Sequence, residues 1–172
     1  TLCECSLFLD GTLMKTTRTL QLARMSALLI TMLVGACGSE SPESMLASAK
    51  EYFARNDSKA AVIQLKNALQ NKPDLAEARF LLGKALLDEG NPVAADVELR
   101  KAAELKYAPD QLVPLQARTL LLMGQAKKVI DELGKVELSS ADAKADLQTS
   151  VGRAHLTTGK VDSAQAAFAA AV

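Results

Sequence analysis

Few side chains in this sequence could perform catalytic or covalent chemistry, because its 172 residues include one histidine, His155, and three cysteines. Cys3 and Cys5 stand in a Cys-x-Cys spacing, and two thiols alone do not complete the four-ligand shell of a structural zinc ion. The sequence contains no HExxH or GxSxG segment and no phosphate-binding glycine loop. His155 stands where a residue between packed helices is expected, which favours a packing role over catalysis. The sequence therefore predicts a chain that is not an enzyme and that holds no metal or cofactor.

Cys37 is the one residue with a specific predicted chemistry, the acylation of its thiol. The segment 14–36 places three basic residues before an apolar stretch at 25–34, and ends on the small residues Gly35 and Ala36. This is the pattern of a bacterial export signal. The apolar stretch is shorter than the roughly 20 residues that span a bilayer, so a transmembrane anchor is the weaker interpretation. The run Val34-Gly35-Ala36-Cys37 resembles the lipobox of bacterial lipoproteins, which implies cleavage after Ala36 and a covalent lipid on Cys37.

The lipobox resemblance also implies where the protein resides. A lipidated cysteine with several acyl chains holds a protein firmly on a membrane. Gly38, rather than aspartate, follows the cysteine, which in Gram-negative lipoproteins is consistent with the outer membrane, facing the periplasm. We expect residues 37–43 to form a short tether and residues 1–13 to be an upstream extension. The alternative is a soluble secreted protein with a stray thiol at position 37.

Small residues recur at a fixed spacing and indicate how the rest of the chain is organised. Ala49, Gly83, Ala117 and Gly152 stand 34, 34 and 35 residues apart, and a period of this length is typical of stacked repeat units. Around each of them the pattern resembles the tetratricopeptide-repeat (TPR) motif. The resemblance implies an all-α fold, a TPR α-solenoid of antiparallel helical hairpins in a right-handed superhelix, over residues 44–172. The expected units are about 42–75, 76–109, 110–144 and 145–172.

Helix-forming composition and boundary residues agree with four hairpins. Alanine- and leucine-rich runs lack an alternating strand pattern, and the sequence predicts helix starts at Asp57-Ser58, Asn91-Pro92 and Asp110. Glycines 90, 124 and 159 are expected in the turns between paired helices. Pro114 falls inside an expected helix, which should therefore begin late or kink. An ordinary helical bundle is the alternative, but it requires no constant period.

The repeat register predicts a binding groove along the first helix of each hairpin. Four basic residues occupy equivalent positions that should face inward, Lys50, Lys84, Arg118 and Arg153, with apolar residues one turn away, Phe53, Phe80, Leu87 and Leu121. The sequence hypothesis is a groove for protein partners or extended peptides with acidic groups, or for an anionic glycan. The alternative is that these are ordinary solvated charges near helix ends.

The overall charge gives no indication of nucleic-acid binding. Twenty lysines and arginines balance twenty aspartates and glutamates, and basic residues are not interleaved with aromatic ones. We therefore expect no nucleic-acid partner, whereas the lipobox predicts contact with the membrane through a lipid anchor.

A narrower resemblance covers the segment 46–118 together with the lipobox. These residues resemble the N-terminal part of the PEP-CTERM system TPR-repeat lipoproteins, which implies a lipid-anchored periplasmic scaffold that acts in exosortase protein sorting or exopolysaccharide export. The chain stops at Val172, inside the expected second helix of the fourth hairpin, and we expect further sequence beyond it. The alternative function is the targeting arm of a larger envelope enzyme, a peptidase or glycan-processing protein, whose catalytic domain follows residue 172.

Overall fold

The computed structural model describes residues 40–172, and these residues are helical, with no strand among them. The elements are α2 (Pro42–Ala54), α3 (Ser58–Asn71), α4 (Ala76–Asp88), α5 (Pro92–Glu104), α6 (Pro109–Leu122), α7 (Ala126–Lys128), the π-helix η2 (Val129–Leu133), α8 (Ala141–Thr157) and α9 (Val161–Ala170). The predicted signal segment, the cleavage site at Ala36, Cys37 and most of the tether lie outside the described residues.

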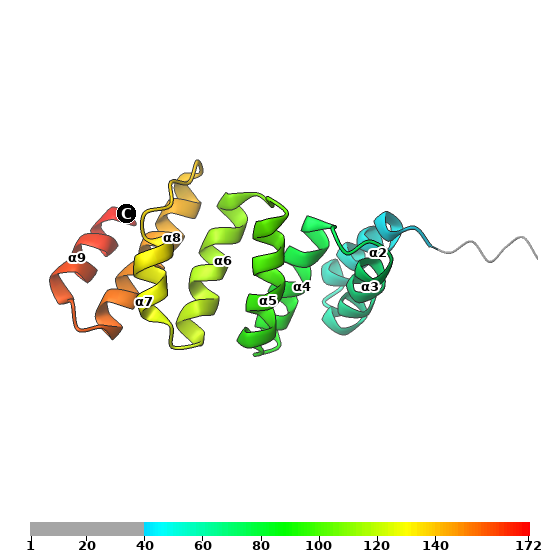
Figure 1. Ribbon diagram of the computed structural model, residues 1–172, viewed down its shortest axis with the longest axis horizontal. Coiled ribbons are helices and arrows are strands. Elements are labelled where there is room, and N and C mark those ends of the chain that lie inside the picture. Colours follow the sequence, from blue (N-terminus) through cyan, green and yellow to red (C-terminus); the bar gives the residue numbers. More distant parts are fainter. Residues whose placement is uncertain (1–39) are drawn as a thin grey trace, which may run out of the picture. The chain divides into compact units, whose positions relative to one another are not determined.

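The unit Ser41–Val172 is a row of hairpins that follow one another in chain order (Figure 1). Its helices pair as α2 with α3, α4 with α5 and α8 with α9, while α6 pairs with α7 and η2. Successive hairpins are joined by contacts of α3 with α4, α5 with α6, and α6 with α8. A helical hairpin cannot bury its apolar face alone, so each one completes its core on its neighbour. The predicted all-α repeat architecture is confirmed.

The recurring small residues lie where paired helices approach most closely. Ala49 and Ala117 are fully buried. A Cβ on Gly83 would lie 2.8 Å from Leu99 Cδ2 on the paired helix α5, and one on Gly152 would lie 2.5 Å from the ring of Phe168 on α9. Such separations are too short for carbon atoms in contact. The 34-residue period therefore marks the contact line within each hairpin.

The predicted helix starts are largely confirmed, with two differences. The side chains of Asp57 and Asn91 accept hydrogen bonds from the backbone N–H groups of the first turns of α3 and α5. Ser41 caps α2 in the same way, so that helix begins at Pro42 and includes the last two residues of the expected tether. Helix α6 begins at Pro109, before Asp110 rather than late, and continues through Pro114. Pro114 lies in the second turn, so only the hydrogen bond to the Asp110 carbonyl is lost.

The turn within each hairpin uses a residue with positive φ. Gly90, Gly124 and Gly159 have φ between 72° and 78°, as their predicted place in turns requires, and Asn56 has φ 60° at the equivalent position of the first hairpin. The third hairpin departs from the expected regular helix, because its second arm is a three-residue α-helix followed by the π-helix η2. This is also the unit with the 35-residue spacing.

Candidate binding groove

A cavity of about 580 Å³ lies along the first helices of the last three hairpins. Its lining comes from α4, α6 and α8, which occupy equivalent places in successive units. The lining residues are Phe80, Lys84, Asp110, Gln111, Pro114, Leu115, Arg118, Asp146, Thr149, Ser150 and Arg153. We call this cavity the basic groove.

Three of the four predicted basic residues line the basic groove. Lys84, Arg118 and Arg153 are exposed, one from each helix. None of the three forms an ion pair with another residue of the segment 40–172. Lys50 differs, because its Nζ lies 2.7 Å from the carboxylate of Glu77 on α4, and it does not line the groove. The register therefore brings three cations together and leaves the fourth in an ion pair.

The acidic residues of the basic groove offset these cations only in part. The Asp110 carboxylate accepts hydrogen bonds from Ser139 N at 2.8 Å, from Ser139 Oγ at 2.5 Å and from Ser140 N at 3.3 Å. These bonds from Ser139 hold the pKa of Asp110 below its ordinary value. Asp110 is thus a structural acceptor that joins the start of α6 to the loop before α8. Asp146 is the other carboxylate in the lining.

An aromatic pair supports one end of the groove. The rings of Phe80 and Tyr107 are stacked with centroids 4.5 Å apart, and the Tyr107 hydroxyl donates a hydrogen bond to Gln111 Oε1 at 2.7 Å. Burial raises the pKa of Tyr107, with a further contribution from the nearby Glu77 charge. Because Gln111 accepts this bond through oxygen, its amide nitrogen remains a donor. The Gln111 amide nitrogen and the cations Lys84, Arg118 and Arg153 therefore make hydrogen-bond donors more numerous than free acceptors in the lining of the groove.

Of the four predicted apolar residues, one lines the cavity and three do not. Phe80 lines the cavity, but Leu87 is buried in α4 and does not. Phe53 and Leu121 are half-buried and pack against the cores of the first and third hairpins. Ser150 and Leu115, which the repeat register did not single out, line the cavity. The signal that could have found them is their place next to Pro114 and Thr149, the residues that the repeat spacing relates to Phe80.

His155, for which the sequence favours a packing role over catalysis, is half-buried on α8. Its Nδ1 atom is enclosed and has no hydrogen-bond partner in the described part of the chain.

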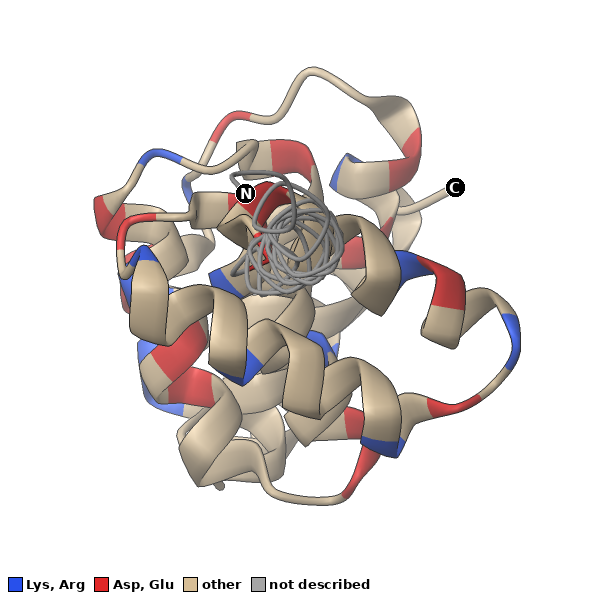
Figure 2. Cartoon of the chain, turned by 90° about the vertical axis from the view of Figure 1, so that its right-hand side faces the viewer, with Lys and Arg blue, Asp and Glu red and all other residues tan. Residues whose placement is uncertain are grey.

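Residues 40–172 hold no group of three or more potential metal ligands. In the same segment, no helix has the length and apolar character needed to cross a bilayer. Figure 2 shows lysines and arginines interspersed with aspartates and glutamates along the helices.

Comparison with known proteins supports the fold. No protein-family model and no curated protein matches the sequence. Two crystal structures of MamA, a TPR protein, are similar to this chain. One superposes with a TM-score of 0.67 at 24% identity, covering 76% of this chain and 70% of MamA. The other has a TM-score of 0.64 at 22% identity and covers 81% of each chain. With its period and its stacked hairpins, the chain therefore has the fold of a tetratricopeptide-repeat α-solenoid.

Proposed function

We propose that this chain is a protein-binding scaffold, and that its basic groove takes an extended partner segment with acidic side chains. The observation that carries the proposal is the convergence of Lys84, Arg118 and Arg153, without ion-pair partners in the described unit, on one cavity. The neighbouring aromatic and apolar surface, Phe80 and Leu115, would contact the apolar part of the same segment.

The expected contribution of the three cations is modest but measurable. An exposed ion pair contributes about 0.2–1 kcal/mol, so three together contribute at most about 3 kcal/mol. This corresponds to a change in affinity of up to about 100-fold. Salt should weaken the interaction, because exposed charges are screened.

Fluorescence anisotropy with labelled peptides tests this assignment. The probes are a peptide of alternating glutamate and leucine, the same peptide with lysine for glutamate, and an oligogalacturonate for the glycan alternative. The proposal expects preference for the glutamate peptide and a loss of at least about tenfold in Lys84→Glu/Arg118→Glu. Lys50→Glu is the matched control, because this exposed cation lies on the same face of its helix but outside the cavity. Unchanged affinity in the double variant, or preference for the glycan, would contradict the proposal.

We further propose that the scaffold is anchored by a lipid on Cys37 to the periplasmic face of the outer membrane. The support is the lipobox resemblance at 34–37 and the charged and apolar segments before it. The resemblance of 46–118 supports a role in PEP-CTERM protein sorting or exopolysaccharide export. Metabolic labelling with an alkyne fatty acid should mark the wild-type protein and not Cys37→Ser. Equal labelling of both, or of neither, would refute the anchor and leave the groove proposal standing.

A further inference from the structure

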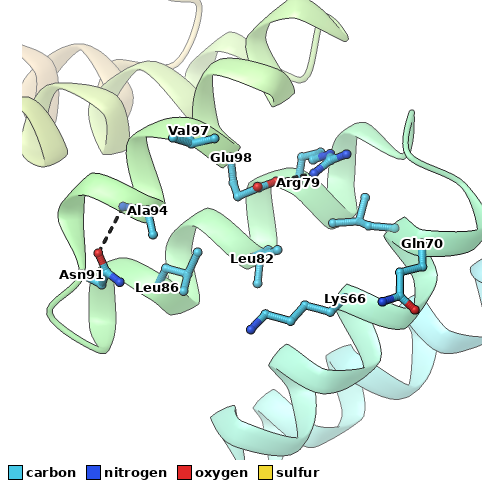
Figure 3. Close-up of a pocket in the computed structure, with 10 residues that line it drawn as sticks. Lys66, Gln70, Arg79, Leu82, Leu86, Asn91, Ala94, Val97 and Glu98 are labelled. Carbon is cyan, nitrogen blue, oxygen red and sulfur yellow. Dashed lines mark hydrogen bonds and ion pairs between the residues drawn. The ribbon is translucent and has the colours of Figure 1, made fainter.

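A second cavity of about 610 Å³ lies between α3, α4 and α5 (Figure 3). Its apolar lining is Leu69, Leu82, Leu86, Ala94 and Val97. On α4, Leu82 and Leu86 lie roughly 200° around the helix axis from Phe80 and Lys84, since successive residues turn by about 100°. This cavity, which we call the apolar cleft, is therefore on the opposite side of α4 from the basic groove.

Most charged groups of the apolar cleft are paired within the protein. Arg79 Nη1 donates to Glu98 Oε2 at 2.6 Å, and its Nε and Nη2 atoms donate to the Pro73 carbonyl at 3.1 and 3.0 Å. The other oxygen of Glu98 accepts from Lys101 at 3.3 Å. Both ends of the Arg79–Glu98 pair are about 15% exposed. This pair is a structural wall of the cleft and offers little to a ligand.

The groups that remain free are donors. Lys66 is exposed and forms no ion pair in the described unit, and Figure 3 shows its side chain extending from α3 across the cleft toward Leu82 and Leu86. Asn91 uses its oxygen to cap α5, which leaves its amide nitrogen free to donate. A ligand would therefore meet an apolar floor with a single cation above it.

Exposed apolar side chains continue from the cleft onto the helices beside it. Val93 and Val97 on α5 are 63% and 47% exposed, and Ile63 on α3 is 58% exposed. Val93 and Val97 lie four residues apart, hence on one face of α5, and Ile63 shares a face of α3 with Lys66. Large apolar side chains gathered on both sides of an apolar cavity are typical of an interaction site.

The third hairpin shows that the repeat itself does not require this apolar surface. A shift of 34 residues relates Leu82, Ala94 and Val97 to Gln116, Lys128 and Asp131. The related cavity in that unit has only about 210 Å³ and includes Gln116 and Lys128 in its lining. There Arg100, the counterpart of Lys66, is held by Asp96 at 2.7 Å. In the third hairpin, polar residues thus replace three apolar ones and the counterpart of Lys66 is paired. In the second hairpin those positions are apolar and Lys66 forms no ion pair with residues 40–172.

We propose that the apolar cleft is a second binding site, whose occupant is a partner protein segment that inserts aliphatic side chains over Leu82 and Leu86 and sets a carboxylate beside Lys66. The choice of an acidic amphipathic segment follows from the charge of the cleft. Within the described repeat unit its one unpaired charge, Lys66, is positive, and the amide nitrogen of Asn91 also needs an acceptor. This site is independent of the basic groove, so the scaffold would hold two partners on opposite sides of α4.

Methyl-detected NMR on the full chain tests the proposal with two defined peptides. One carries two leucines four residues apart with a glutamate beside them, and the other has lysine in place of glutamate. We expect the glutamate peptide to shift the methyl signals of Leu82, Leu86 and Val97, and to bind at least about threefold more tightly than the lysine peptide. Lys66→Glu should reverse that preference.

Two variants separate the cleft from general surface effects. Val97→Asp introduces the residue that the third hairpin carries at this position, so it should fold and should weaken binding at least about fivefold. Lys127→Glu, at an exposed cation of the third hairpin that lines neither the cleft nor the basic groove, should leave the titration unchanged. No methyl shifts, an equal response to both peptides, or an unaltered preference in Lys66→Glu would overturn the proposal. A concentration-dependent dimer in sedimentation that Val97→Asp abolishes would overturn it too, because a second copy would then be the occupant.

Discussion

Substitution of Gly83 by alanine tests whether the small residue of the repeat is required by the contact with the paired helix. Gly83 lies inside α4, where alanine is intrinsically better than glycine by about 0.5–1 kcal/mol. Its new Cβ, however, would lie 2.8 Å from both Cδ2 and Cγ of Leu99 and 3.3 Å from the Ala95 carbonyl oxygen. Leu99 is fully buried, so a shift of its side chain would have to displace other core residues.

The two effects oppose each other, and their magnitudes decide the sign. Overpacking a tight core costs about 1–3 kcal/mol. After the gain in helix propensity is subtracted, we expect Gly83→Ala to lower the free energy of unfolding by about 0.5–2 kcal/mol. Leu99→Ala alone should cost about 2–5 kcal/mol, because it leaves a cavity at that contact. In that background the added methyl group meets no side chain, and Gly83→Ala should stabilise by about 1 kcal/mol.

Urea denaturation followed by circular dichroism measures all four proteins of this double-mutant cycle. A change of sign between the two backgrounds is the expected result. The difference between the two effects of Gly83→Ala is insensitive to effects on the unfolded chain, which cancel in the cycle. Ala49→Gly is the matched control, since the first hairpin already holds alanine at this position without exposure, and it should destabilise by about 1–2 kcal/mol. If Gly83→Ala stabilises the wild-type background as much as the Leu99→Ala background, the close-contact explanation of the period is refuted.

Three further predictions concern single contacts of the described unit. Arg79→Met should lower the free energy of unfolding by about 2–3 kcal/mol. This is below the usual cost of a broken buried ion pair, because Lys101 still pairs with Glu98. A loss under about 0.5 kcal/mol in urea denaturation would show that the Arg79–Glu98 pair is dispensable for stability. Asp110 has a lowered pKa in the folded state, so its contribution to stability is present above its ordinary pKa and disappears as the pH falls through the lowered value. Thermal melts of Ser139→Ala should therefore differ from wild type at neutral pH and converge with it in acid, and a constant difference would contradict this linkage. Lys106→Gly should raise the melting temperature by a few degrees, since Lys106 has φ 58° and its left-handed conformation costs about 1 kcal/mol or more. A lower melting temperature would mean that the flexibility of glycine in the unfolded chain outweighs that strain.

Sequence alone predicted the hairpins because their determinants are local or strictly periodic. Helix caps such as Asp57 and Asn91, the turn glycines, and the small residues of the contact line each act within one helix or one hairpin. The groove cations were also found this way, because a 34-residue translation carries one surface position to its equivalent in the next unit. Where that translation holds, as from Lys84 to Arg118, a linear pattern is enough to predict neighbours in space.

Contacts between helices were decided only by the tertiary structure. Nothing in the period distinguishes Lys50, paired with Glu77, from Lys84, which has no such partner between residues 40 and 172, because pairing depends on the distance between two particular helices. The same is true of Asp110 and Ser139, which are 29 residues apart, and of Leu87, which turns to the core where the register placed it at the groove. The apolar cleft arises because α3 and α5 lie on either side of α4. A repeat fixes which positions are equivalent, but the packing of neighbouring hairpins fixes which side chains meet, and that is a property of three-dimensional distances.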